Sequence, residues 1–389
     1  MKKIAVVTTT RAEYGLLAPI IKRLRDFENP DLKVELIVSG THLYKEYGMT
    51  VNEIRTQSVR IDHEVLIPVN SHSAIDISNN QAAALTKFAE LFSKEKYSAL
   101  LILGDRYEML AVAMAASNTR IPIFHISGGD VTEGAIDDCI RHAITKMSYL
   151  HFTTNEESRK RVIQLGEEPD RVFNYGSTSI DNILNMAVMS KREAMDSVGV
   201  KKERYALCTY HPVTLEDGNI KENMDNFLAA IKSFDNIEFI VTKSNADQGG
   251  EAINRILDEA SIEIPNLYVY SSLGVKRYLS LMKYAQFVMG NSSSGIVEAP
   301  AFHIPTVNIG DRQRGRLQAE SIINCTPDCS AIVAAMEKAL SVEIKNRCKS
   351  ITSPYGDGCS AERVVKKMME VVGRPVDLKK RFFDIEVSV

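Results

Sequence analysis

Short runs of apolar, largely β-branched residues alternate with helical stretches along most of the chain, and this pattern constrains its fold most. The runs predict strands over residues 4–7, 34–38, 99–103, 121–126, 150–153, 205–209, 237–241, 267–270, 287–289 and 306–309. The stretches between them predict helices over 16–25, 107–117, 136–147, 223–233, 251–259 and 276–285. Apolar strands that alternate with helices are typical of parallel sheets covered on both faces.

The strands fall into two series, and a chain of 389 residues is too long for one compact core. We therefore expect an α/β protein with two Rossmann-like domains. The Gly/Ser/Thr-rich residues 174–179 are the best linker candidate, which gives domains of residues 1–175 and 176–360. Residues 361–389 are expected to form a C-terminal helix and tail, with the N-terminal domain as the candidate surface on which they pack back.

Charge and composition exclude several classes of protein. The 47 Lys+Arg nearly balance the 50 Asp+Glu, which argues against a nucleic-acid or membrane-surface partner but leaves an anionic small ligand open. No apolar run approaches the roughly 20 residues of a membrane span, and the first run is too short for a signal peptide. A cytoplasmic location is expected. The six cysteines lack zinc-ligand spacing, so free thiols and no metal are expected.

Ligands bind beyond the carboxyl ends of parallel strands, so residues after each strand are the first candidates for a site. Arg11 follows the first strand and could hold a phosphate, although an Arg11–Glu13 surface pair is the alternative. Asp105 and Arg106 follow residues 99–103 as a possible base and anchor. Alternatively, Asp105 is the N-cap of the next helix, and it could be both the base and the cap.

The densest cluster of ionisable residues follows the strand at 121–126. Asp130, Glu133, Asp137 and Asp138 come before Arg141, with a histidine at each end of the segment. Asp137 and Arg141 are four residues apart and would share a helix face, either as site residues or as a solvated ion pair. We expect an active-site segment here.

The second half of the chain has candidate phosphate-binding residues at three strand ends. His211 could donate a proton to a phosphate leaving group, although a lone histidine is more often structural. The segment 290–298 contains Ser292, Ser293, Ser294, Gly295 and Glu298, and its serines and backbone N–H groups suit an anion while its acid suits ribose hydroxyls. The alternative is a Ser-rich helix cap.

Three arginines lie within five residues after the strand at 306–309, and they include Arg312 and Arg316. Such a loop suits a diphosphate, and a solvated basic loop is the alternative. Acids in the first half and phosphate-type residues in the second half together suggest an enzyme that acts on a nucleotide sugar.

The order of these motifs resembles that of UDP-N-acetylglucosamine 2-epimerases over nearly the whole chain. The motifs are residues 11–15, 104–106, 136–138 with 141–142, 291–298 and 309–316. The Arg-Ala-Glu-Tyr and Arg-His-Ala-Ile-Thr-Lys-Met-Ser forms look like the hydrolysing branch, which releases UDP and N-acetylmannosamine for sialic-acid synthesis.

The resemblance implies a glycosyltransferase-B-type fold with two Rossmann-like domains around a cleft. It also implies that a base removes the C2 proton while UDP leaves, giving 2-acetamidoglucal, to which water then adds. The resemblance implies no cofactor, and it implies a homodimer or homotetramer.

The resemblance also suggests roles for individual residues. Asp105 and Asp137 become candidate acid/base groups near the sugar, and His211 a group that supports the leaving diphosphate. Arg11 would lie on the phosphate side and Glu298 on the ribose. The remaining candidates for substrate or UDP binding are Arg106, Arg141, Ser292, Ser293, Ser294, Gly295, Arg312 and Arg316.

One position departs from the family pattern. Related enzymes often carry Glu where this chain has Ser127, and a serine cannot be a carboxylate base. Asp130, Asp137 or water would then cover that role. The substitution also suggests a second candidate substrate, the UDP-linked 2,4-diacetamido-2,4,6-trideoxy sugar of the legionaminic-acid pathway. Three further functions stay open at this point: a non-hydrolysing epimerase, a glycosyltransferase and a nucleotide-sugar binding protein.

Overall fold

The computed structural model describes residues 1–27, 29, 31–133, 135–213, 220–244 and 249–386. They divide into two compact units: unit 1 comprises Met1–Asp130, Ile136–Leu184 and Tyr355–Val389, and unit 2 comprises Val131–Ala135 and Asn185–Pro354. Residue 134 and residues 387–389 lie outside the described part. None of the helices in these described ranges combines the length and apolar character that a membrane crossing needs.

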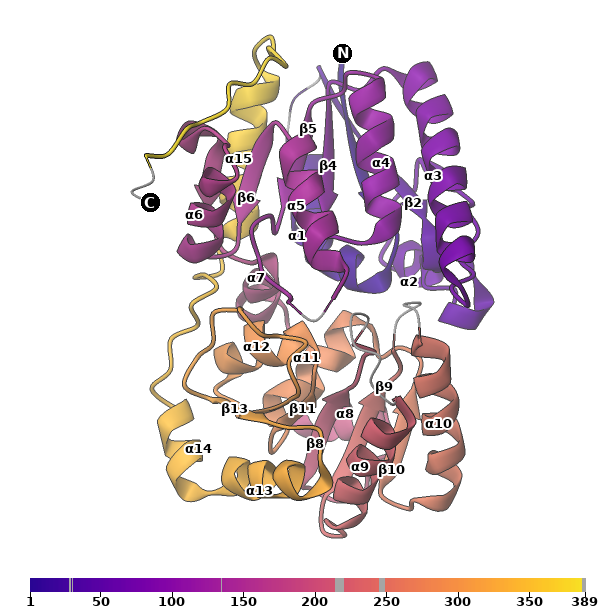
Figure 1. Cartoon of the computed structure of the whole chain (residues 1–389), viewed down its shortest axis with the longest axis vertical. Coiled ribbons are helices and arrows are strands. Elements are labelled where there is room, and N and C mark those ends of the chain that lie inside the picture. The colour runs from indigo at the N-terminus through magenta and orange to yellow at the C-terminus, as the bar shows by residue number, and fades with distance from the viewer. Residues whose placement is uncertain (28, 30, 134, 214–219, 245–248, 387–389) are drawn as a thin grey trace. The chain divides into compact units, whose positions relative to one another are not determined.

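Unit 1 is built on a seven-stranded parallel sheet in the order β3-β2-β1-β4-β5-β6-β7. Figure 1 labels β2, β4, β5 and β6 of this sheet. Its strands are β1 Lys2–Thr8, β2 Leu32–Ser39, β3 His63–Val65, β4 Ala99–Leu103, β5 Ile123–Ile126, β6 Leu150–Thr153 and β7 Val172–Asn174. Its helices are α1 Arg11–Arg25, α2 Val51–Thr56, α3 Ala74–Glu95, α4 Tyr107–Asn118, α5 Asp137–Met147, α6 Glu156–Gln164, α7 Thr178–Asn185, which runs one residue into unit 2, and α15 Ser360–Val372.

Successive residues of the central strands of unit 1 face opposite layers of helices. Val6 and Leu101 pack with α1 and α15, whereas Val7 and Leu100 pack with α3 and α4. Both faces of the sheet are therefore buried, which is why these strands are continuous apolar runs in the sequence.

Unit 2 repeats this plan around a six-stranded parallel sheet in the order β10-β9-β8-β11-β12-β13. Its strands are β8 Tyr205–Thr209, β9 Glu238–Thr242, β10 Leu267–Tyr270, β11 Val288–Gly290, β12 Thr306–Ile309 and β13 Ile322–Cys325. Its helices are α8 Lys191–Asp196, α9 Ile220–Lys232, α10 Gly250–Glu263, α11 Gly274–Tyr284, α12 Ser293–Val297, α13 Cys329–Leu340 and α14 Val342–Cys348. The expected α/β class with two Rossmann-like domains is confirmed.

The chain leaves unit 1 after α7 rather than after residue 175. Thr178 donates to the Leu16 carbonyl and Asn182 to the Gly15 carbonyl, which ties α7 to α1. The Asp181 carboxylate accepts the backbone N–H groups of Ser360 and Ala361 at the start of α15. The Gly/Ser/Thr-rich stretch expected to be a linker is thus part of the packing of unit 1.

The C-terminal helix and tail return to unit 1. α15 contributes Val364 and Met368 to the core that also contains α1. Beyond it, Lys380 Nζ donates to Glu167 Oε2 at 2.6 Å and to the Ser148 carbonyl at 2.7 Å, at the end of α5.

Candidate active site

Asp105 lies at the carboxyl end of β4 and is held by Arg141 of α5. The Arg141 Nη2 donates to Asp105 Oδ2, while its Nη1 donates to the Asp130 carbonyl at 2.6 Å and to Asp138 Oδ1 at 3.2 Å. Burial alone would lower the pKa of the Arg141 guanidinium, but Asp105, Asp130 and Asp138 together raise it above its ordinary value. A buried cation therefore fixes the position of the Asp105 carboxylate.

The same helix, α5, begins at Asp137, so its first turn and the Arg141 side chain belong to one rigid element. The structure pairs Arg141 with Asp138, three residues before it, and with Asp105 from another strand. The sequence placed Asp137 on the same helix face as Arg141, with a solvated ion pair between them as the alternative, and this stays a prediction. Asp137 is half-buried at the N-terminus of α5, where a carboxylate is favourable.

Asp130 is buried, and its carboxylate is engaged by two hydroxyl groups. Thr154 and Ser158 each donate to Asp130 Oδ1 at 2.6 Å. The preceding Gly129 has φ +79, and a Cβ there would collide with the Ser158 carbonyl oxygen. The turn that carries Asp130 is therefore packed tightly on α6, which gives the carboxylate a structural role besides its proposed catalytic one.

The first helix begins earlier than expected, at Arg11, so the loop after β1 is short. Glu13 is buried, and its carboxylate accepts the Thr9 N–H at 2.6 Å and the Thr10 N–H at 3.2 Å. Burial raises the pKa of Glu13 to about 7, although the Thr9 bond and the nearby Arg106 oppose the shift. The alternative of an Arg11–Glu13 surface pair is wrong because Glu13 is buried and its carboxylate caps the N-terminus of α1.

Arg106 and Glu108 form a buried pair that the sequence did not reveal. Arg106 Nε donates to Glu108 Oε2 at 3.2 Å, and Glu108 is fully buried. Arg106, not Asp105, is the N-cap residue of α4, and its side chain caps nothing. The alternative in which Asp105 caps that helix is therefore wrong, and its carboxylate is oriented by Arg141 instead.

His125 connects the loop after β4 with α5. Its Nε2 lies 2.9 Å from the Gly104 carbonyl oxygen, and its Nδ1 lies 3.4 Å from Thr145 Oγ1. Burial lowers the pKa of His125 to about 4, so the ring is neutral at physiological pH and donates from Nε2 to the carbonyl. His125 thus supports the backbone just before Asp105.

In unit 2, His211 lies beyond β8 and is held by its backbone and its ring. Asn291 Oδ1 accepts the His211 N–H at 2.7 Å, and Asn291 Nδ2 donates to the His211 carbonyl at 2.8 Å. The ring Nδ1 lies 3.1 Å from Ser244 Oγ. Sequence reasoning included Asn291 only within a serine-rich motif, and its side-chain role has no signal in sequence because its partner is 80 residues away.

The serine-rich segment forms the short helix α12. Ser292 is its N-cap, and its Oγ accepts the Ser294 N–H at 3.4 Å, while Ser294 Oγ lies 2.5 Å from the Tyr278 hydroxyl. Ser293 has no hydrogen bond to another described side chain, so its hydroxyl is available to a ligand. A Cβ on Gly295 would lie 2.8 Å from Thr306 Cγ2, so this glycine lets α12 pack closely on β12.

Glu298 is half-buried at the end of α12, and burial raises its pKa to about 7. Within the described ranges, its carboxylate has no hydrogen-bond or ion-pair partner. An acid that is desolvated without a cation is costly unless a ligand supplies hydrogen-bond donors.

The arginine loop follows β12. Arg312 Nη1 donates to the Asn291 carbonyl at 3.2 Å, while its buried Nε has no partner among the described residues. Arg316 Nη2 donates to Thr132 Oγ1 at 3.1 Å. Arg312 and Arg316 are half-buried, which is not what a fully solvated basic loop would show.

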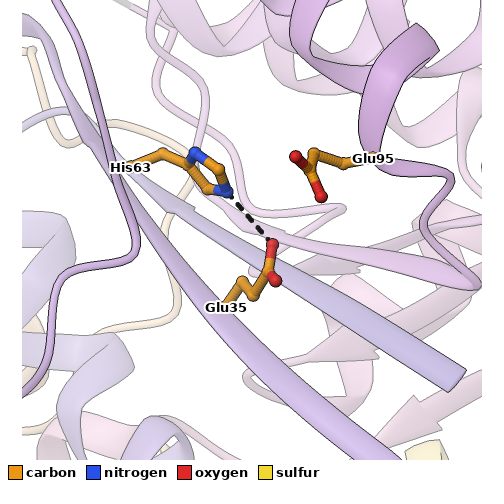
Figure 2. A group of neighbouring side chains, drawn as sticks. All are labelled: Glu35, His63 and Glu95. Carbon is orange, nitrogen blue, oxygen red and sulfur yellow. Dashed lines mark hydrogen bonds and ion pairs between the residues drawn. The ribbon is translucent and has the colours of Figure 1, made fainter. Parts of the chain in front are cut away.

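A separate cluster toward the amino ends of β1 and β2 has ligand types suited to a metal (Figure 2). His63 Nε2 lies 3.1 Å from Glu35 Oε2, and Glu95 is close by. Two ammonium groups already neutralise the two acids, since Lys33 contacts Glu35 at 2.5 Å and Lys3 contacts Glu95 at 2.6 Å. Burial opposes the shift, but these donors and Tyr97 lower the pKa of Glu35 to about 2. We interpret the cluster as an ion-pair network.

Comparison with known proteins agrees with the motif order. The family model for UDP-N-acetylglucosamine 2-epimerase matches residues 25–369. The polysialic acid biosynthesis protein P7 of Escherichia coli is 38% identical, covering 99% of this chain and 98% of the relative. The GDP/UDP-N,N'-diacetylbacillosamine 2-epimerase (hydrolyzing) of Campylobacter jejuni is also 38% identical and covers 99% of each chain.

Among solved structures, the UDP-GlcNAc 2-epimerase of Neisseria meningitidis, bound to UDP-GlcNAc, superposes with a TM-score of 0.80. It is 17% identical and covers 95% of this chain and 100% of its own, so it supports the fold. The resemblance stated from the sequence motifs is confirmed. The chain belongs to the UDP-N-acetylglucosamine 2-epimerase family of enzymes.

Proposed function

We propose that the protein is a hydrolysing 2-epimerase that converts UDP-N-acetylglucosamine and water to N-acetylmannosamine and UDP. The observation that carries this proposal is the Arg141 side chain, which joins Asp105 after β4 to the helix that begins at Asp137. The family match and the relatives named as hydrolysing epimerases support the reaction class.

The proposed reaction has two steps. A carboxylate takes the C2 proton as the C1–O bond to UDP breaks and the C1–C2 double bond of 2-acetamidoglucal forms. Water then adds its hydroxyl to C1, and a proton returns to C2 from the opposite face. Asp105 and Asp137 are the proposed proton carriers, with Asp130 as the further candidate. Because hydrogen leaves and returns as a proton, the sugar undergoes no net oxidation.

We assign the UDP moiety mainly to residues of unit 2. His211 would support the departing diphosphate, the half-buried Arg312 and Arg316 would bind its oxygens, and Ser293 would add a hydroxyl donor. The Glu298 carboxylate would accept hydrogen bonds from the ribose hydroxyls. Ser292, Ser294 and Gly295 would shape this site.

Three arginines of unit 1 have further proposed roles. Arg11, on the first turn of α1, is the proposed phosphate-side arginine. Arg106 and Arg141 also stay proposed substrate-binding residues, although Glu108 and Asp105 already engage their guanidinium groups.

A second candidate substrate is the UDP-linked 2,4-diacetamido-2,4,6-trideoxy sugar. It is favoured by the name of the Campylobacter jejuni relative and by Ser127 in place of a family glutamate. The same two-step reaction would apply. Parallel assays of UDP release from both sugars decide between the two substrates, and the sugar with the higher kcat/KM is the substrate.

Two variants test the acid assignments. Asp105→Asn and Asp137→Asn should each abolish turnover while leaving UDP affinity unchanged, since neither acid is assigned to the nucleotide. Asp26→Asn, at the exposed C-cap of α1, is the matched control and should behave as the wild type. Sugar transfer to an acceptor, or tight binding of both sugars without any reaction, would refute the proposal in favour of a transferase or a binding protein. The proposed homodimer or homotetramer can be measured by sedimentation.

A further inference from the structure

Asn291 fastens three segments of unit 2 to one another at the carboxyl edge of its sheet. It follows β11, is fully buried, and its N–H donates to the Thr209 carbonyl at 3.2 Å. Its side-chain amide meets the His211 backbone at two points, 2.7 Å at the N–H and 2.8 Å at the carbonyl. The amide thus continues the pairing of β8 with β11 beyond the end of the sheet.

The backbone carbonyl of Asn291 holds the arginine loop. It accepts Arg312 Nη1 at 3.2 Å and Gln313 Nε2 at 2.8 Å, and Gln313 is fully buried. The preceding Gly290 has φ +130, and a Cβ there would overlap the Thr209 carbonyl oxygen. This close approach of β11 to β8 brings the Asn291 amide within reach of His211.

We propose that Asn291 is a positioning residue that sets the placement of both His211 and Arg312 for the departure of UDP. The inference rests on the proposed function, because it assumes that His211 and Arg312 act on the diphosphate. Asn291 would act through these two residues rather than on the substrate. A buried amide that is held at both its oxygen and its nitrogen has a fixed geometry, and loss of such geometry slows chemistry by amounts on the order of 100-fold.

The experiment compares Asn291→Ala in two backgrounds. In the otherwise unchanged protein, kcat for UDP release should fall on the order of 100-fold. In a His211→Gln background the same change should cost about tenfold or less, because the residue that Asn291 positions is already gone. The volume-conserving Asn291→Asp is the second variant should the alanine fail to fold, and it should also slow release because it removes the donor to the His211 carbonyl.

Asn266→Ala is the matched control. Asn266 is also buried in unit 2 and donates to the Phe234 and Ile237 carbonyls, both at 2.9 Å. It directly precedes β10, however, and so lies at the amino end of the strands rather than at their carboxyl end. It should keep kcat near the wild-type value. Equal losses from Asn291→Ala in both backgrounds, equal losses from Asn266→Ala, or a His211→Gln variant with full activity would each overturn the inference.

A binding measurement separates this inference from the proposed function. Asn291→Ala keeps the backbone carbonyl that accepts Arg312 but removes the amide that holds His211. It should therefore weaken UDP binding through His211 and leave uridine binding unchanged, because uridine has no phosphate. If the wild type released UDP from neither sugar, the proposed function would fail, while this measurement would still decide the role of Asn291. Equal weakening of UDP and uridine would overturn it.

Discussion

The Glu298 carboxyl group should make nucleotide-sugar binding depend on pH near neutrality. Burial raises its pKa to about 7, and no cation among the described residues offsets the burial. Ribose hydroxyls donate hydrogen bonds to a carboxylate, so the ionised form is the one that binds. Affinity should therefore be full above the pKa and be lost as the pH falls through it.

The size of the effect follows from that pKa. With a pKa of about 7, roughly nine-tenths of the unliganded protein carries the Glu298 carboxylate at pH 8 and roughly one-tenth at pH 6. The dissociation constant should rise about tenfold between these two pH values, which corresponds to about 1.4 kcal/mol.

Calorimetric titration with UDP-glucose between pH 6 and pH 8 measures this directly, because the diphosphate of a UDP-sugar stays fully ionised over that range. Glu298→Gln should bind weakly and with little pH dependence, since an amide does not titrate. Glu320→Gln, at an exposed acid of the same unit, should keep the pH dependence of the wild type. A Glu298→Gln protein with wild-type affinity and wild-type pH dependence would refute the ribose assignment.

Three further changes have expected effects on stability, each measured by urea or thermal unfolding. Gly290→Ala should destabilise by at least about 2 kcal/mol, because its Cβ would overlap a carbonyl of β8, and a protein as stable as the wild type would contradict the packing described. Arg141→Met should cost about 3 kcal/mol because it leaves the half-buried Asp105 and Asp138 carboxylates without their buried cation, and a neutral effect would show that they find other partners. Lys380→Ala should cost about 1 kcal/mol at neutral pH, whereas the exposed Lys379→Ala should cost nothing. The ionised Glu167 carboxylate is the partner of Lys380, and the pKa of Glu167 is lowered to about 2 in the folded protein. The contribution of this carboxylate to stability is therefore present above the pKa of about 4.3 that Glu167 has in the unfolded chain, and it is lost as the pH falls toward 2.

With the exception of the edge strand β10, the strands that could be located from the sequence lie in the interior of a sheet. β4 and β8 have the expected bounds because every residue in them is buried and their apolar runs are continuous. β3, β7 and β13 were not expected. Each is short and lies at an edge of its sheet, where partial exposure weakens the apolar signal. The edge strand β10 could still be located because its run Leu267–Tyr270 is apolar and aromatic throughout.

The rule that ligands bind at strand ends predicted the loops of the candidate site but not the contacts within them. Asp105 and Arg141 are 36 residues apart, whereas the sequence could relate Arg141 only to Asp137, which helical spacing places on the same face of one helix. Contacts between elements depend on the order of strands in the sheet. The neighbouring positions of β4 and β5 bring Asp105 to α5, and sequence spacing does not encode that order.

The most direct test of the proposed reaction is the deuterium content at C2 of the released sugar when the wild type acts in heavy water. Elimination followed by hydration predicts one solvent deuterium at C2 of the N-acetylmannosamine, or of its diacetamido counterpart, for each UDP released. Release of UDP with no deuterium at C2 would show simple hydrolysis of the sugar–phosphate bond and contradict the assignment of Asp105 and Asp137 as proton carriers.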